Sequence, residues 1–181
     1  MTDLNSRKSY WAFCVALLLL LLSSALWSQD SSAPSQVPPQ LKPPTDAKLI
    51  LHARGKGDQV YVCKQDGSQF SWSLKEPQAE LLDESGKVIG RHFAGPSWQL
   101  NDRSQVSGKV IARIDSPNAD AVPWLLLGAG DHSGTGLMSG VSYIQRLNTS
   151  GGKAPNAGCD AAHAGAESRI SYSADYYFFG K

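Results

Sequence analysis

The sequence predicts an all-β protein, either a single antiparallel β-sandwich or a closed β-barrel, with little helix. Three observations lead to this fold class. Apolar residues alternate with polar ones in several runs, turn-forming residues separate those runs, and no long amphipathic helix is found. Because successive side chains of a strand point to opposite faces, this alternation gives each strand one apolar face. Residues 47–181 are numerous enough to form one core.

Three runs show the alternation most clearly. In Phe70–Leu74 the apolar residues alternate with serines. The run Val106–Asp115 alternates over ten residues, with Ile111 as the one exception. The run Ile170–Phe178 alternates aromatic and small apolar residues with Ser and Asp. Each run is predicted to be a strand with one buried face.

Two segments are bulky on both faces. Trp124–Leu127 is a run of four large apolar residues, which predicts a central strand covered on both sides. Tyr172–Phe179 places rings on both faces of one strand. Since rings bury a large area, we interpret this strand as part of the core. An exposed aromatic face that binds a partner or glycan is the alternative.

Turn signals divide the remaining chain. The hairpin Glu80–Phe93, with its turn at Ser85-Gly86, is the clearest local unit. Asn156–Glu167 is rich in glycine and alanine and is expected to be one helical turn or a loop. Further turns are predicted at Gly55-Lys56-Gly57-Asp58, Asp66-Gly67, Gly95-Pro96, Ser116-Pro117-Asn118 and Gly151-Gly152.

The N-terminal residues form an export signal in this interpretation. Arg7 and Lys8 precede an apolar run, Trp11–Trp27, which is followed by small polar residues. Residues 1–28 are therefore predicted to be a signal peptide, with an uncleaved membrane anchor as the alternative. Both place the following domain outside the cytoplasm, in the periplasm or secreted. Residues 29–46 are rich in Pro and Ser and are predicted to be a disordered spacer before a single β domain, 47–181.

The charge balance excludes one class of partner. The chain has 17 basic and 16 acidic residues, and without residues 1–28 the two numbers become equal. An exported domain with balanced charge and no basic stripe is not expected to bind nucleic acid. Contact with a membrane is expected only through the N-terminal segment, if that segment stays uncleaved. The oligomeric state is not predicted.

Three cysteines are present, and one of them, Cys14, lies in the apolar run. The other two, Cys63 and Cys159, would reach an oxidising compartment after export, where thiols tend to pair. We predict a disulfide between them. Two buried free thiols are the alternative.

Several segments together resemble one family of exported proteins, the domain of unknown function 3455. The resemblance covers residues 49–179. It rests on these segments: WSLKEPQAEL (72–81), GRHFAGPSW (90–98), PWLLL (123–127), YIQRLNTSGG (143–152), Gly158-Cys159-Asp160 and YSADYYF (172–178).

The resemblance implies export and a compact domain, and it supplies no activity or catalytic residues. The family typically has Asp-Gly-Ser where this chain has Asp102-Arg103-Ser104. A left-handed turn is not expected there, because arginine replaces the glycine. Some fungal members carry a malate dehydrogenase label. The sequence does not support that label, because Gly128-Ala129-Gly130 lacks the remaining fingerprint and the following helix.

The candidate ligand-binding residues are His92, Trp98, Asp102 and Arg146. The first three lie within eleven residues, and Arg146 lies in a later predicted strand. If these strands meet, the four side chains would line a polar pocket with an aromatic wall. Such a pocket suits a sugar or an acidic small molecule. The alternative is structural, with the Trp in the core, the His capping a strand end and an Arg–Asp pair joining two loops.

No motif points to a specific reaction. The chain has no Gly-x-Ser-x-Gly elbow and no spaced histidine pair, so neither a catalytic triad nor a metal site is predicted, and no cofactor is expected. We therefore expect a non-enzymatic binding or cell-envelope domain whose partner is a small molecule or glycan. The alternative is a small secreted hydrolase that uses His92, Asp102 and Arg146.

Overall fold

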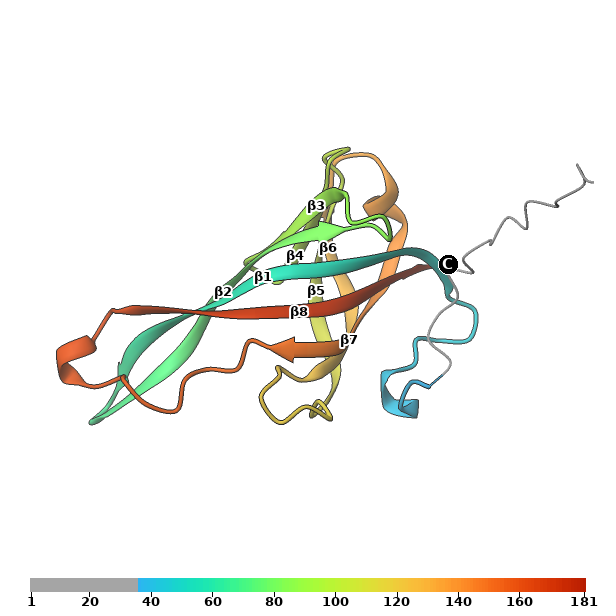
Figure 1. The fold of residues 1–181 in the computed structure, drawn as a ribbon. Coiled ribbons are helices and arrows are strands. Elements are labelled where there is room, and N and C mark those ends of the chain that lie inside the picture. Colours follow the sequence, from blue (N-terminus) through green and yellow to red (C-terminus); the bar gives the residue numbers. More distant parts are fainter. Residues whose placement is uncertain (1–35) are drawn as a thin grey trace, which may run out of the picture. The chain divides into compact units, whose positions relative to one another are not determined.

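Eight antiparallel strands close into a barrel in which each strand pairs with its neighbour in sequence and β8 returns to pair with β1 (Figure 1). The structure is a computed structural model, and it describes residues 36–181. The strands are β1 (Lys48–Asp66), β2 (Gln69–Leu82), β3 (Val88–Phe93), β4 (Ser97–Leu100), β5 (Gln105–Ile114), β6 (Trp124–Ser133), β7 (Val141–Gly151) and β8 (Glu167–Gly180). The predicted all-β fold is confirmed, in its closed form.

Helix is limited, in the part of the chain that the structure describes, to three 3₁₀ turns. These are η1 (Pro39–Leu41), η2 (Leu137–Gly140) and η3 (Ala161–His163). None of the described helices is long and apolar enough to cross a membrane. The predicted signal or anchor, residues 1–28, lies outside the described residues. The short η3 agrees with the expectation of one helical turn or a loop over Asn156–Glu167.

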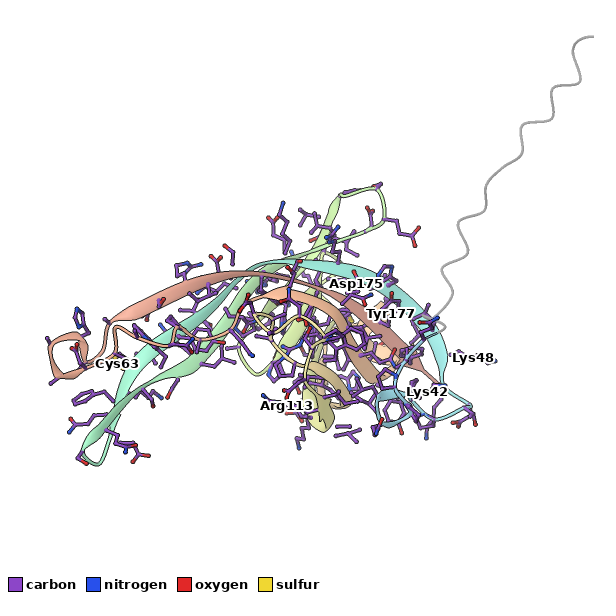
Figure 2. All side chains as sticks on the ribbon, turned by 60° about the horizontal axis from the view of Figure 1, so that its bottom comes forward. Lys42, Lys48, Cys63, Arg113, Asp175 and Tyr177 are labelled. Carbon is purple, nitrogen blue, oxygen red and sulfur yellow. A yellow bond between two sulfur atoms is a disulfide. The ribbon has the colours of Figure 1, made fainter. Side chains whose placement is uncertain are left out.

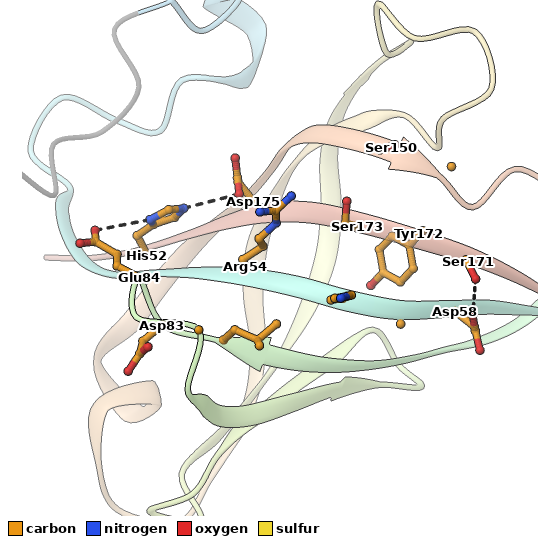
Figure 3. A pocket seen from close by; sticks show the side chains of 15 residues that line it. His52, Arg54, Asp58, Asp83, Glu84, Ser150, Ser171, Tyr172, Ser173 and Asp175 are labelled. Atoms are coloured by element: carbon orange, nitrogen blue, oxygen red, sulfur yellow. Dashed lines mark hydrogen bonds and ion pairs between the residues drawn. The ribbon is translucent and has the colours of Figure 1, made fainter.

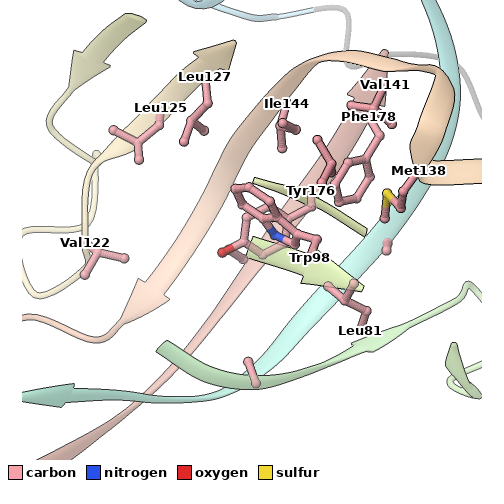
Figure 4. Close-up of a cluster of buried hydrophobic side chains, with 14 of the residues drawn as sticks. Leu81, Trp98, Val122, Leu125, Leu127, Met138, Val141, Ile144, Tyr176 and Phe178 are labelled. Atoms are coloured by element: carbon pink, nitrogen blue, oxygen red, sulfur yellow. The ribbon is translucent and has the colours of Figure 1, made fainter. Parts of the chain in front are cut away.

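The C-terminal strand β8 supplies rings to two separate cores. Tyr176 and Phe178 point into the barrel, where they pack with Trp98 (Figure 4). Tyr177 and Phe179 point outward and belong to a second apolar cluster. All four of these β8 rings are buried. The prediction that this strand is part of the core is therefore confirmed.

The outer cluster is covered by residues 37–41. Val37 and Leu41 pack against Tyr177 and Leu147, and Leu41 has no exposed surface. The Gln145 side-chain amide donates a hydrogen bond to the Leu41 carbonyl oxygen. The prediction of a disordered spacer over 29–46 is therefore wrong for this part, because its two large apolar residues bury against the barrel. Residues 29–35 lie outside the described residues.

Strands β5 and β6 contribute to both clusters. In β6, Leu125 and Leu127 face the inside, and Leu126 packs in the outer cluster, which confirms a strand covered on both faces. In β5 the register with β6 shifts between Val110 and Ala112, so Ile111 is the extra residue of a bulge. The bulge accounts for the exception at Ile111, but the prediction of one buried face for this run is wrong. Val106 packs inside the barrel, Ala112 and Ile114 pack in the outer cluster, and Val110 and Ile111 are more than half exposed.

One predicted turn is wrong. Residues Gly55–Asp58 lie within β1 and pair with both β2 and β8. A Cβ atom on Gly55 would come within 2.6 Å of the Tyr176 ring. Gly57 is equally crowded by the backbone of Ala79. Both glycines are therefore required for close packing inside the barrel, and not for a change of chain direction.

The first two strands and the last run past the barrel to form an extension, called here the arm (Figure 1). It consists of residues 60–66 of β1, 69–76 of β2, and 153–169. The disulfide Cys63–Cys159 joins β1 to the loop before β8, as predicted. In Figure 2, Cys63 lies far along β1 from Lys48, so the bond secures the arm and not the barrel. The Trp72 indole N–H adds a 2.9 Å hydrogen bond to the Ala157 carbonyl.

Replacement of Leu41 by alanine tests the packing of residues 37–41. We expect Leu41→Ala to lower the free energy of unfolding by about 2–5 kcal/mol, because it leaves a cavity at a fully buried site. Gln40→Ala, at the exposed neighbouring position, is the matched control. The measurement is equilibrium urea denaturation. Equal midpoints for both variants would show that these residues do not pack on the barrel.

Loss of the disulfide tests the contribution of the arm. The bond joins two residues that are 96 positions apart in sequence. Because it restricts the unfolded chain, it is expected to stabilise the folded state by about 4–5 kcal/mol. In urea denaturation, the free energy of unfolding of the double variant Cys63→Ala, Cys159→Ala should be lower by that amount. Addition of a reductant should destabilise the natural chain equally and leave the double variant unchanged. A natural chain insensitive to reductant would contradict the account.

Candidate functional site

The closed fold places three of the four predicted ligand-binding residues around one ring inside the barrel. His92 and Trp98 are opposite each other on β3 and β4, and their rings stack at 4.6 Å between centroids. Both rings meet Tyr176 edge-on, at 5.2 and 5.5 Å. Burial raises the pKa of Tyr176, and the nearby charge of Arg146 opposes this effect. Tyr176 therefore links the stacked pair to Arg146.

His92 is held as a neutral base. Its side chain is 2% exposed, and its Nδ1 atom lies 2.9 Å from the Ser97 carbonyl oxygen. Burial is the main cause that lowers the pKa of His92 to about 3. The hydrogen bond with Ser97 acts against this shift, and the positive charge of Arg146 adds to it. No carboxylate is among the contacts that the structure gives this ring. The ring is therefore suited to packing and to one backbone hydrogen bond.

Arg146 extends along the inner face of β7. Its Nε and Nη2 atoms donate hydrogen bonds of 3.1 and 2.9 Å to the Pro123 carbonyl oxygen, at the start of β6. The Arg–Asp pair of the structural alternative does not form, since no ion pair links Arg146 to an acidic residue in the part of the chain that is described. Its partners are a backbone oxygen and aromatic side chains.

Asp102 has different neighbours from the other three. Its carboxylate accepts hydrogen bonds from the Ser104 amide and hydroxyl, at 2.8 and 2.6 Å, and from the Leu137 amide. The bond from the Ser104 hydroxyl is the main reason that the pKa of Asp102 lies below its usual value. Asp102 thus fixes the β4–β5 turn to η2. Arg103 in this turn has φ of 70°, so the left-handed turn forms despite the arginine, contrary to expectation.

An open groove lies on the outer surface of the barrel, away from the predicted residues (Figure 3). Its volume is about 950 Å³. The floor is the outer face of β1 and β8, and the walls are the β2–β3 turn and the end of β7. We call it the outer groove, and its main lining residues are His52, Arg54, Lys56 and Asp58 of β1, Ser171, Ser173 and Asp175 of β8, Leu82, Asp83, Glu84 and Gly86 of the turn, and Ser150 and Gly151 of β7.

The strand register explains why these residues gather. Ala53 and Gly55 face the inside of the barrel, so Arg54 and Lys56 must face outward. Across the β1–β8 ladder, Arg54 is opposite Asp175, Lys56 is opposite Ser173, and Asp58 is opposite Ser171. Cross-strand pairs on one face lie about 5 Å apart, so the floor is a double row of polar groups.

His52 closes one end of the outer groove. Its Nε2 atom lies 3.7 Å from an Asp175 oxygen, its Nδ1 atom lies 3.9 Å from a Glu84 oxygen, and its ring stacks on Tyr177 at 4.5 Å. The contact with Asp175 is the main reason that the pKa of His52 is raised, against the effect of burial. Burial opposes ionisation of Asp175, but bonds from His52 and Asn148 outweigh it and keep that pKa low.

The sequence prediction did not identify the outer groove. A signal for it was present, because His52, Arg54, Lys56 and Asp58 form a period-two run of four charged or titratable groups. The glycines between them predict a turn, and a turn does not place the four side chains on one face of a strand. The serines of β8 predict the polar face of a strand, but the sequence does not show which strand lies beside it.

Fold and surface together define a class of protein: a disulfide-linked, eight-stranded antiparallel barrel that carries a polar groove on its outside. The sequence profile of the family described as "Protein of unknown function (DUF3455)" matches residues 43–180, and the chain belongs to this family. The resemblance found in the sequence is thereby confirmed. No curated protein matches the chain, and no solved structure matches it.

The pH dependence of stability tests the environment of His92. The unfolded chain binds a proton at this position near pH 6.5, whereas the folded chain does so only near pH 3. The neutral His92 ring therefore makes its full contribution to the free energy of unfolding above pH 6.5. That contribution is lost as the pH falls towards 3, by up to about 1.4 kcal/mol per pH unit. His92→Gln should reduce this slope in urea denaturation between pH 7 and 4. An unchanged slope would show that His92 titrates normally.

Proposed function

We propose that this chain is an exported, non-enzymatic binding domain that takes up a small polar molecule or a glycan in the outer groove. The observation that carries the binding role is the groove itself, a volume of about 950 Å³ lined by charged and hydroxyl side chains. Small-molecule sites in proteins are concave, have volumes of this order, and present a few convergent polar groups.

Export is supported by two independent features. Arg7 and Lys8 followed by Trp11–Trp27 have the composition of a signal sequence or an anchor. The Cys63–Cys159 disulfide fits an oxidising compartment. A periplasmic or secreted location follows if the segment is cleaved, and a membrane-anchored one follows if it is retained.

A binding role is favoured over the hydrolase alternative by the contacts of the predicted catalytic residues. A general base needs its ring within hydrogen-bond reach of the substrate, and a carboxylate usually orients that ring. His92 is buried and neutral, and Asp102 is engaged with Ser104 and Leu137. These two residues therefore do not supply the arrangement that the hydrolase needs.

The binding role is tested with a library of sugars, sugar acids and small metabolites. The purified protein is mixed with each compound, and the backbone amide shifts of an isotope-labelled sample are followed by NMR. We expect at least one compound to move the amides of residues 52–58 and 171–175 in a saturable way. Saturable shifts confined to other surfaces, or no shifts at all, would contradict the proposal.

Export is tested separately. The full chain and a form without residues 1–28 are expressed side by side, and the mature protein is sequenced from its N-terminus. We expect the full chain outside the cytoplasm with its disulfide formed, and the shortened form inside the cell with free thiols. A full chain that stays in the cytoplasm would contradict export.

A further inference from the structure

The acidic and the basic side chains of the outer groove differ in whether they already have partners within the protein. The carboxylates are engaged within the protein. Asp58 pairs with Arg169 at 3.2 Å and accepts a bond from Ser171, and Asp83 accepts bonds from Ser85 and Lys87. At the other end, Asp175 and Glu84 both face His52.

The two basic side chains on the floor of the groove, Arg54 and Lys56, have no such partners among the described residues. Within residues 36–181, the side chain of Lys56 has no hydrogen bond and no ion pair. The side chain of Arg54 has none either, although its charge contributes to the low pKa of Asp175. Both side chains are exposed, and as neighbours on one face of β1 they project side by side into the groove. The strongest free donors of the groove are thus two adjacent cationic groups.

The rest of the lining suits a ligand rich in hydroxyl groups. The hydroxyls of Ser150 and Ser173 line the groove and have no hydrogen bond to another described residue. A hydroxyl both donates and accepts, and a carboxylate with two partners retains lone pairs that can accept from a ligand hydroxyl. Ligand hydroxyl groups could therefore bind along the groove on either side of the two cations.

We propose that the outer groove binds a saccharide that carries one carboxylate, a uronic acid unit, with the carboxylate held between Arg54 and Lys56. This assignment rests on the proposed binding function and specifies its ligand class. The bidentate geometry of a guanidinium matches a carboxylate, and an ammonium adds a second charge-assisted bond. Four carboxylates also line the groove, namely Asp58, Asp83, Glu84 and Asp175. Their charges oppose an anion anywhere except between the two cations, so each further carboxylate on a ligand weakens its binding.

The test compares two disaccharides that differ only in the acidic group. Cellobiouronic acid carries a carboxylate where cellobiose carries a hydroxymethyl group. Titration calorimetry on the purified full protein should show tighter binding of the acid by about tenfold or more. Glucuronic acid alone is the third probe, and it shows whether the monosaccharide is sufficient or the second sugar is needed.

Variants assign the effect to the two cations. Lys56→Gln and Arg54→Gln should each weaken binding of the acid by about tenfold and leave the affinity for cellobiose unchanged. Lys109→Gln, at an exposed position of β5 outside the groove, is the control and should bind like the natural chain. Since both groove side chains are exposed, urea midpoints should be unaltered, which separates loss of binding from loss of fold.

The possible failures are distinguishable. Equal affinity for cellobiose and its acid, or an unchanged affinity in both groove variants, overturns the acidic-saccharide assignment. If other compounds of the library shift the groove amides and neither uronic acid probe binds, the assignment is overturned and the binding function stands. If no compound shifts these amides, the binding function is overturned as well.

Discussion

The pairing of the first strand with the last is the constraint on which the rest of the structure depends. β8 pairs with β1 from Lys48 to Val62 and with β7 along its other edge, and these ladders close the barrel. Closure removes the free edges of the sheet and separates an inner face from an outer one along every strand. The same ladder extends into the arm, where the disulfide joins β1 to the loop that precedes β8. It also places the outer face of β1 beside that of β8 to form the floor of the outer groove.

The two faces of the barrel have different chemistry as a result. Inside, rings pack closely, and the one histidine among them, His92, is kept neutral by burial. Arg146 brings a charge to this interior, which also holds the polar side chains of His92 and Gln59. Its guanidinium donates to a backbone oxygen and lies near Tyr176. Outside, Arg54 and Lys56 are exposed to water, whereas Asp175 and His52 are partly buried and are held in their charged forms by each other. Recognition of a polar ligand is therefore less costly on the outer face.

The sequence was sufficient for those parts of the fold that depend on local pattern. Alternation identified β5 and β8, and cysteine number and the expected compartment identified the Cys63–Cys159 bond. The pattern failed where a distant contact decides the structure. Gly55 and Gly57 resemble turn residues until the Tyr176 ring and the Ala79 backbone are placed against them. The packing of Leu41 depends on an outer apolar surface to which five strands contribute.

The candidate site was less predictable for the same reason. His92 and Trp98 are neighbours, as expected, but composition does not show on which face of a closed barrel a side chain lies. Asp102 was grouped with them by nearness in sequence, and its carboxylate is used in a local turn. The residues of the outer groove come from strands at opposite ends of the chain, so only the β1–β8 register brings Lys56 beside Ser173.

The most direct test of this account is a measurement of that register in solution. Nuclear Overhauser contacts between backbone protons of residues 54–58 and residues 171–175 report the pairing without reference to any ligand. The account predicts contacts along the whole run, with Arg54 opposite Asp175 and Asp58 opposite Ser171. Absence of these contacts, or a register shifted by one residue, would contradict it, because the closed barrel and the floor of the groove would both be lost.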